Sequence, residues 1–166
     1  MLADATPKSV VVGVDYDQRA VKITRDYFTA SNLPYRAGNL AMWRDFEDRP
    51  LGQFDCVISF DTIEHLLHRE IALLNIAENL SNDGILLLST PCGHSRTRFN
   101  PEWEPHKIEY SHTDLYKLLR RFFRNVLHTG NGTFPNQKFW DNVINAGSRR
   151  YSNVMNPVVC TEPIRI

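Results

Sequence analysis

The chain has 166 residues, which is one domain's worth of sequence and long enough to bury a sizeable core. Hydrophobic residues make up 42% and charged residues 23% of it, with 19 basic against 19 acidic side chains, as in globular proteins without a net basic field. This balance argues against a nucleic-acid-binding protein, and the longest apolar runs are far shorter than the about 18 residues of a membrane-spanning helix.

Local features agree with that composition. Arg120, Arg121 and Arg124 fall late in a predicted amphipathic helix, where cations oppose the helix dipole, so we expect no nucleic-acid partner. The three cysteines lie far apart and form no metal-like pair, which indicates neither a disulfide framework nor a zinc ribbon. Because the N-terminus also lacks an apolar leader, we expect a cytoplasmic protein with no membrane partner.

The first part of the chain predicts a strand, a helix and a second strand. Residues 10–14 are a continuous apolar, β-branched run of strand length, and Asp17 is placed to cap the helix behind it. That helix carries apolar side chains at helical spacing, namely Ala20, Val21, Ile23, Tyr27 and Phe28. A breaker at 32–34 precedes an extended piece at 35–40, and a charged, turn-rich connection follows to residue 53.

The middle of the chain repeats this alternation. Residues 54–60 predict a strand that runs into Asp61 and Thr62, either of which can cap the next helix. The helix keeps apolar residues at helical spacing, namely Ile63, Leu67, Ile71 and Leu74. We expect it to end at residues 81–84, with Gly84 suited to a left-handed conformation, before a buried strand at 85–88.

The last part predicts one more helix and two strands. Ser111 and Asp114 form an S-x-x-D capping box before a helix with several apolar positions. Residues 124–129 and 158–161 predict strands without a helix between them, and such a pair can form an antiparallel edge. The alternation as a whole predicts one α/β domain over residues 1–166, with a mostly parallel sheet whose ligands bind at the carboxyl ends of the strands.

Five segments, taken in order, carry a resemblance to a known family. They are VVGVDYD, YRAGNLAMW, FDCVISFDTIEHL, NDGILLLSTP and EPHKIEYSHTDLYKLLRRFF. Their order and spacing resemble the class I S-adenosylmethionine-dependent methyltransferases, most closely the small-molecule branch related to quinone-biosynthesis methyltransferases. The resemblance implies a Rossmann-like fold, S-adenosylmethionine as the cofactor, and methyl transfer to an oxygen, nitrogen or carbon atom of a small-molecule acceptor.

The first strand end supplies two predicted cofactor contacts. The family gives the position matched by Asp15 the role of accepting both ribose hydroxyls, which a carboxylate can do in a bidentate contact. Tyr16, the next residue, can pack on the adenine face. The alternative for Asp15 is a helix cap, but Asp17 is better placed for that role.

Two further strand ends complete the predicted cofactor site. Asn39 stands where the family usually has Asp; its carbonyl can accept from the adenine amino group, while Leu40 offers a backbone N–H. A turn asparagine after Gly38 is the alternative for Asn39. The resemblance also assigns Phe60 and Asp61, at the next strand end, to the cofactor.

Histidines are the candidates for acid–base chemistry. His106, in the segment PHKIEYS, is the first choice for a general base, and His65 is the second, since imidazole can take up a proton near neutral pH. The alternative for His106 is a surface histidine that packs on Trp103. His65 and His68 have a spacing that can hold a metal, but no third ligand follows at a convincing distance, so we expect no metal.

The main departure from the family is a missing segment. The family has a strand and a D-x-G-x-G-x-G turn before its first helix, and this strand lies in the centre of the family's sheet. No residues before Asp15 match that strand or that turn. Three outcomes follow: a fragment of a longer protein, closure of the flanking strands on each other, or exchange with a second copy in a homo-oligomer. Loss of about three backbone hydrogen bonds at 0.5–1.5 kcal/mol each would weaken cofactor binding roughly ten-fold to several thousand-fold.

Two other functional classes stay open. The chain can be a non-catalytic remnant or binding module that keeps the scaffold, or another nucleotide-binding α/β protein such as a reductase. The aromatic residues Trp103 and Tyr110 and the stretch GNGTFPNQKFW suggest a lid over a hydrophobic acceptor, with surface packing as the alternative.

Overall fold

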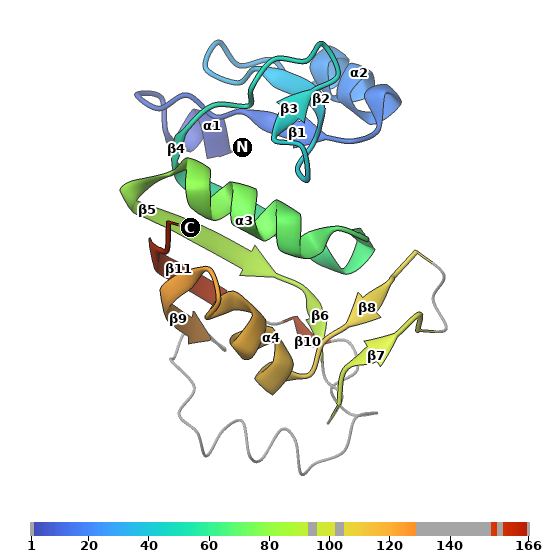
Figure 1. Ribbon diagram of the computed structural model, residues 1–166. Helices are drawn as coiled ribbons and strands as arrows, with labels where there is room; N and C mark the ends of the chain where they lie inside the picture. Colours follow the sequence, from blue (N-terminus) through green and yellow to red (C-terminus); the bar gives the residue numbers. More distant parts are fainter. Residues whose placement is uncertain (1, 93–95, 102–104, 129–153, 156–157, 166) are drawn as a thin grey trace. The chain divides into compact units, whose positions relative to one another are not determined.

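The computed structural model describes residues 2–92, 96–101, 105–128, 154–155 and 158–165. Contacts between residues divide the chain into two compact units, Met1–Gly52 and Gln53–Ile166, and each is described by itself (Figure 1). The predicted lid stretch GNGTFPNQKFW and Trp103 lie outside the described residues. No helix of the described residues is long and apolar enough to cross a membrane.

The first unit is a strand–helix–strand unit on a small sheet. Its elements are α1 (Leu2–Ala5), β1 (Gly13–Asp15), α2 (Gln18–Tyr27), β2 (Tyr35–Asn39) and β3 (Arg44–Asp45). β1 runs parallel to β2, with Asp15 opposite Ala37, and β3 pairs antiparallel with the other edge of β2. The strand order is therefore β1-β2-β3, and α2 makes the crossover between the two parallel strands.

Local sequence explains these elements. The Asp17 side chain accepts from the Arg19 N–H at 2.8 Å and caps α2, as predicted. Gly13 lets β1 approach β2, because a Cβ atom there would lie 2.5 Å from the Tyr35 ring. The predicted helix and second strand are confirmed, but β1 begins at Gly13 rather than at Val10, and β3 was not predicted.

The second unit contains the larger sheet. Its main strands are β4 (Phe54–Phe60), β5 (Leu80–Ser89), β9 (Phe123–His128) and β11 (Val158–Pro163), in the order β4-β5-β11-β9. β4 runs parallel to β5, while β11 is antiparallel to both β5 and β9. The predicted antiparallel pair is confirmed, but its last strand, β11, lies inside the sheet, and β9 forms the edge.

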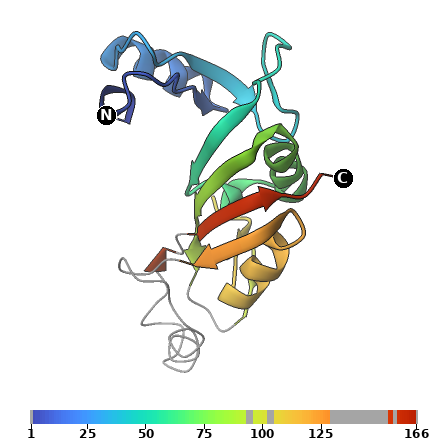
Figure 2. The same ribbon diagram turned by 90° about the vertical axis from the view of Figure 1, so that its left-hand side faces the viewer.

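Two helices cover one face of this sheet. They are α3 (Arg69–Asn79), which contacts β5, and α4 (His112–Leu119), which contacts β9, and Figure 2 shows both on the same side. Beneath them lies an apolar core whose side chains are at most 1% exposed, among them Leu73, Ile76, Leu86, Leu88 and Leu119. On β4 and β9, Ile58 and Leu127 remain 44% exposed.

Short elements connect this framework. They are the 3-10 turn η1 (Ile63–His65) and the strands β6 (Pro91–Cys92), β7 (Arg98–Phe99), β8 (Ile108–Glu109) and β10 (Val154–Met155). β6 pairs with β10 and β7 with β8, each pair antiparallel. Ser111 caps α4 by accepting from the Asp114 N–H at 3.2 Å, which confirms the predicted capping box.

The helix after β4 differs from its prediction. α3 begins only at Arg69, because residues 63–65 form the tighter turn η1, so neither Asp61 nor Thr62 caps it. Its buried face consists of Ala72, Leu73, Ile76 and Ala77. The predicted apolar row was therefore wrong in part, since Leu67 is 72% and Ile71 48% exposed.

Gly84 was also predicted in the wrong conformation. Its φ is not positive; among the described glycines, Gly52 has a positive φ, of 103°. The reason for glycine at position 84 is close packing, because a Cβ atom would lie 2.9 Å from the Ser81 backbone nitrogen. Residues 80–89 form β5, and the register of β5 against β4 shifts between Phe54 and Cys56.

β1 and β4 are the strands that flank the predicted gap. In the described residues, β1 belongs to the sheet of the first unit and β4 to that of the second.

Candidate functional site

The first unit brings four predicted cofactor residues to one edge of its sheet. Asp15 ends β1 and Asn39 ends β2, and the two strands are parallel neighbours. Tyr16 and Leu40 follow directly in the chain. The carboxyl end of this small sheet therefore presents a carboxylate, an amide and an aromatic ring together.

Asp15 and Asp17 divide two roles between them. Asp17 caps α2. The exposed Asp15 carboxylate accepts a hydrogen bond at Oδ1 from the Asp17 N–H at 2.8 Å, which fixes its orientation. A carboxylate has about four acceptor sites, so one such bond leaves Asp15 able to accept from a vicinal diol. The cap alternative for Asp15 is wrong, because Asp17 fills it.

Asn39 takes part in a turn. Its side-chain carbonyl accepts from the Ala41 N–H at 2.9 Å, which is the local bond expected of a turn asparagine. A carbonyl oxygen has a second lone pair, so this bond does not prevent a contact with a ligand donor. The two readings of Asn39 are compatible.

An aromatic pair stands at the same edge. The Tyr16 and Phe46 rings meet edge to face, with centroids 5.3 Å apart and planes at 81°, although Tyr16 is 71% and Phe46 45% exposed. Sequence reasoning missed Phe46, because it lies in a segment interpreted as a charged connection. Exposed paired rings of this kind can form a platform for a heterocyclic base.

Asp45 organises the turn that carries Phe46. Its Oδ1 accepts from the backbone N–H groups of Glu47 and Arg49 at 3.0 and 2.9 Å, and its Oδ2 accepts from Arg49 Nε at 2.8 Å. Burial favours a higher pKa, but hydrogen bonds from Arg49 and Glu47 outweigh it and hold the pKa of Asp45 below its ordinary value. The apparent connection is thus an ordered turn around a buried acid.

A hollow in the first unit does not coincide with these residues. It has a volume of about 330 Å³ and is lined by Arg25, Phe28, Leu33, Tyr35 and their neighbours. Since β2 begins at Tyr35 and ends at Asn39, the hollow lies at the opposite end of the strand from the predicted cofactor residues. We therefore assign it no role in cofactor binding.

In the second unit, Phe60 and Asp61 lie at the carboxyl end of β4, as predicted. Phe60 is 56% exposed, and the Asp61 N–H donates to the Ser89 carbonyl at the end of β5. Asp61 has a φ of 48°, a left-handed conformation that turns the chain sharply into η1. This turn places the next side chains, from Ile63 onward, close to the sheet edge.

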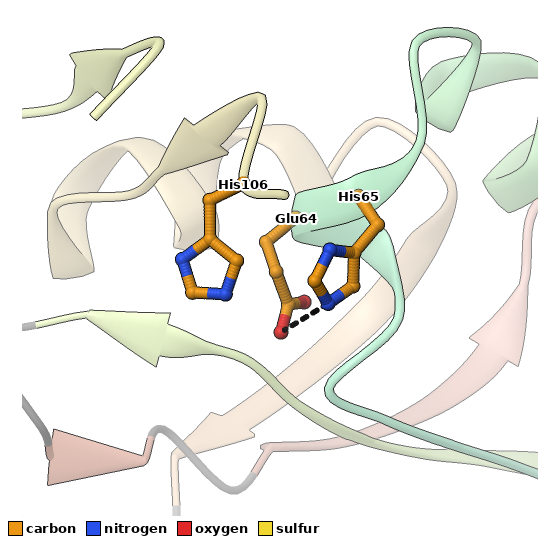
Figure 3. A group of neighbouring side chains, drawn as sticks. All are labelled: Glu64, His65 and His106. Carbon is orange, nitrogen blue, oxygen red and sulfur yellow. Dashed lines mark ion pairs between the residues drawn. The ribbon is translucent and has the colours of Figure 1, made fainter. Parts of the chain in front are cut away.

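The predicted bases His65 and His106 lie together, with Glu64 between them (Figure 3). The two imidazole centroids are 4.9 Å apart, and His65 Nε2 lies 3.9 Å from Glu64 Oε1. Backbone contacts explain this approach: the Lys107 N–H donates to the Glu64 carbonyl at 2.7 Å, and His65 Nδ1 bonds the Pro105 carbonyl at 3.0 Å. The segment at 105–107 is thereby fixed against η1.

Each side chain of this cluster, hereafter the Glu64–His65–His106 cluster, has a supporting partner. His106 Nδ1 lies 2.8 Å from Glu109 Oε1, and the Thr90 hydroxyl donates to Glu64 Oε2 at 2.9 Å. Glu64 is fully buried and His106 only 7% exposed, so the surface-histidine alternative for His106 is wrong. Burial raises the pKa of Glu64, although bonds to the backbone and Thr90 oppose the rise.

Sequence reasoning found the two histidines but not their surroundings. The sequence prediction gave no role in the site to Glu64, Thr90 or Glu109. The predicted pair of His65 and His68 is not what the structure gathers, since His68 is exposed and stands at the N-cap of α3. The missed signal was the adjacency of Glu64 and His65 at a strand end.

Residues 2–128 match a family model described as a methyltransferase domain. This match covers well over half of the 166 residues. The chain belongs to this methyltransferase family. The predicted class of enzyme, and S-adenosylmethionine as its cofactor, are thereby confirmed at the level of the family, and no curated protein sequence matches the chain.

Solved structures agree on the fold. A putative methyltransferase in complex with the Haloferax volcanii Trm112 activator has a TM-score of 0.62 at 14% identity, covering 97% of this chain and 77% of that one. The N-terminal domain of EvdMO1 with SAH bound has a TM-score of 0.62 at 17% identity, and the match covers 98% of this chain and 69% of that one. An S-adenosylmethionine-dependent methyltransferase from Mesorhizobium loti has a TM-score of 0.60 at 12% identity, and the match covers 91% of this chain and 79% of that one. The Rossmann-like methyltransferase fold is thus confirmed.

Proposed function

We propose that this chain binds S-adenosylmethionine and transfers its methyl group to an oxygen, nitrogen or carbon atom of a small-molecule acceptor. The observation that carries the proposal is the common edge of β1 and β2, where Asp15, Tyr16 and Asn39 stand together. Membership in the methyltransferase family supports S-adenosylmethionine as the ligand of this edge.

The cofactor roles follow from the chemistry of each residue. Asp15 accepts the two ribose hydroxyls, while Tyr16, with Phe46 beside it, provides the adenine platform. Asn39 and the Leu40 N–H face the adenine edge. Phe60 and Asp61, at the end of β4, keep in this proposal the cofactor-binding role that the resemblance gives them.

Methyl transfer needs few protein groups. The acceptor lone pair attacks the sulfonium methyl carbon, the carbon–sulfur bond breaks, and its electron pair stays on sulfur, so positioning supplies most of the catalysis. An oxygen or nitrogen acceptor also loses a proton, which His106 takes through Nε2 while Glu109 holds Nδ1. His65 is the second base of the proposal.

We further propose that cofactor binding is weak in this chain. The 166 residues contain no D-x-G-x-G-x-G stretch, so the backbone donors that this turn gives the methionine end in the family have no counterpart in the sequence. The free thiols Cys56 and Cys160 suit the reducing cytoplasm, which we propose as the chain's compartment.

Calorimetric titration with S-adenosylmethionine and S-adenosylhomocysteine tests the proposal. We expect measurable binding of both to the wild-type chain and a loss of about 10- to 100-fold in Asp15→Ala, because two hydrogen bonds to a carboxylate disappear. The matched control is Asp26→Ala, which removes an exposed carboxylate near the end of α2.

Three results would count against the proposal. Neither ligand binds the wild-type chain at millimolar concentration, or Asp15→Ala binds as well as Asp26→Ala does. Tight binding of a nicotinamide cofactor in place of both ligands would favour the reductase class instead.

A further inference from the structure

We propose that Glu64, His65 and His106 bind a divalent transition-metal ion of the Zn²⁺ type. Each offers one ligand atom, and these atoms all lie within 4.8 Å of one another. The proposal concerns the second unit alone and goes beyond methyl transfer, since the ion is held by the protein without cofactor or acceptor.

The spacing of the donors fits one small ion. Two ligand atoms that each lie about 2.1 Å from a tetrahedral zinc ion are about 3.4 Å apart. The distance of 3.9 Å between His65 Nε2 and Glu64 Oε1 is near this value, and Figure 3 shows a ring nitrogen of each histidine turned toward the carboxylate. No pair of the three ligand atoms is more than 4.8 Å apart, so coordination requires the side chains to rotate toward one another.

The supporting contacts hold each donor in the form that binds metal. Metal-bound histidines typically donate the second ring N–H to a carboxylate or a backbone carbonyl. His65 Nδ1 faces the Pro105 carbonyl at 3.0 Å and His106 Nδ1 faces Glu109 Oε1 at 2.8 Å, so each bond assigns the proton to Nδ1 and the lone pair to Nε2. Thr90 orients the Glu64 carboxylate in the same way.

The Glu64 carboxylate is the donor best placed to bind a cation. The residue is fully buried, and its Oε1 has no hydrogen-bond partner among the residues that the structure describes. A buried carboxylate oxygen without a donor costs about 1–3 kcal/mol or more, and either a proton or a cation at that atom can offset the cost. Oε1 is the oxygen that faces His65, in the centre of the cluster.

The donor types select the class of ion. Two imidazoles and one carboxylate suit Zn²⁺, Co²⁺, Fe²⁺ or Ni²⁺, whereas Mg²⁺ and Ca²⁺ favour oxygen ligands throughout. Three protein ligands also leave at least one position open for a further oxygen ligand. The neighbouring imidazole of His65 is 35% exposed at its side chain, so solvent reaches this side of the cluster.

The consequence for catalysis rests on the proposed function. An acceptor hydroxyl at the open position would lose its proton to water more readily, because the ion stabilises the resulting oxygen anion. That anion then attacks the sulfonium methyl carbon. With the ion bound, His65 and His106 act as ligands through Nε2, and neither is needed as the base.

Metal binding can be measured without cofactor or acceptor. The tag-free full chain, stripped with a chelator, is titrated with Zn²⁺ by calorimetry and with Co²⁺ by visible absorption, at pH 7.5. We expect one ion per chain, and a loss of affinity of at least about 100-fold in Glu64→Gln and in His65→Ala, more than the 10–100-fold typical of a supporting residue. Glu109→Gln should lose about ten-fold.

His68→Ala is the matched control, since it removes an exposed histidine three residues from His65 and should bind Zn²⁺ as the wild type does. Circular dichroism verifies the fold of each variant. If Glu64→Gln is unfolded, the Zn²⁺ affinity of His65→Ala tests the proposal, because the His65 side chain is only partly buried. The proposal is wrong if the wild-type chain binds Zn²⁺ no more tightly than His65→Ala, or if His68→Ala loses as much affinity. S-adenosylmethionine binding is scored separately, so either proposal can fail alone.

Discussion

Asp45, the last residue of β3, and Glu64, in η1, are both buried carboxylates, yet their hydrogen-bond partners differ. Both oxygens of Asp45 accept hydrogen bonds, from two backbone N–H groups and from Arg49. Glu64 accepts from Thr90 at Oε2, while Oε1 has no hydrogen-bond partner among the described residues. Both oxygens of Asp45 are therefore hydrogen-bonded within its own unit, whereas one oxygen of Glu64 is not, in the part of the chain that the structure describes.

If the metal proposal holds, this difference separates a structural acid from a functional one. A buried polar group that is fully hydrogen-bonded stabilises the local fold, and the turn of Asp45 in that way positions Phe46. A buried polar group left incomplete lowers stability unless a ligand completes it. The incomplete acid lies beside two histidines, which is where chemistry is expected.

The largest expected effect on stability comes from replacing Glu64 together with its hydrogen-bond donor Thr90. In the metal-free protein, the double substitution Glu64→Leu with Thr90→Val replaces the buried polar pair by apolar groups. We expect it to raise the free energy of unfolding by about 1–4 kcal/mol, because neither group must then be desolvated. Urea unfolding in the presence of a chelator measures the change.

The single substitution Thr90→Val is the matched control for that gain. It deletes the donor but leaves the carboxylate, so it should lower the free energy of unfolding by about 1–3 kcal/mol. Equal losses in the single and double variants would show that Glu64 contributes to stability and would end the distinction from Asp45.

The fold was largely predictable because most elements have local causes. Asp17 and Ser111 mark helix starts by their own hydrogen bonds, and the strand at residues 54–60 is defined by its apolar run. The prediction was wrong where tertiary contacts decide. η1 replaces the first turn of the expected helix, and close packing, not a left-handed conformation, explains Gly84.

The site was predictable in its parts but not in its connections. Strand ends identified Asp15 and Asn39, and residue type identified His65 and His106. No sequence pattern indicates that the Lys107 N–H bonds the Glu64 carbonyl, and that contact is what unites the two histidines. Phe46 was missed for a similar reason, since a charged segment conceals the turn that Asp45 builds.

A smaller effect tests what the satisfied acid positions. Phe46→Ala removes one ring of the exposed pair with Tyr16, so we expect S-adenosylmethionine affinity to fall about two- to ten-fold, as for a loss of 0.5–1.5 kcal/mol of aromatic contact. Stability should change by less than about 0.5 kcal/mol, because Phe46 is 45% exposed. Phe99→Ala is the matched control, being 68% exposed in the second unit. Equal affinity in the two variants would remove Phe46 from the cofactor site.

The smallest effect concerns the charge of Asp45. Burial favours a higher pKa, but the bonds from Arg49 and Glu47 hold the pKa of Asp45 below its ordinary value in the folded protein. Because its pKa is lowered on folding, the charged Asp45 contributes fully to stability when the pH is above the ordinary aspartate pKa. This contribution is lost as the pH falls through the lowered pKa of the folded protein. Stability at neutral pH should therefore not respond to Asp45 titration, and the turn should loosen only below about pH 4.

Amide resonances of Glu47 and Arg49 report this titration directly, because both N–H groups donate to Asp45 Oδ1. We expect a transition whose midpoint lies below the ordinary aspartate value in the wild type and no such transition in Asp45→Asn. A midpoint at the ordinary value would mean that the bonds to the charged form add nothing. The hydrogen bonds of Asp45 would then not favour its charged form, and the contrast between the two acids would rest on the metal proposal alone.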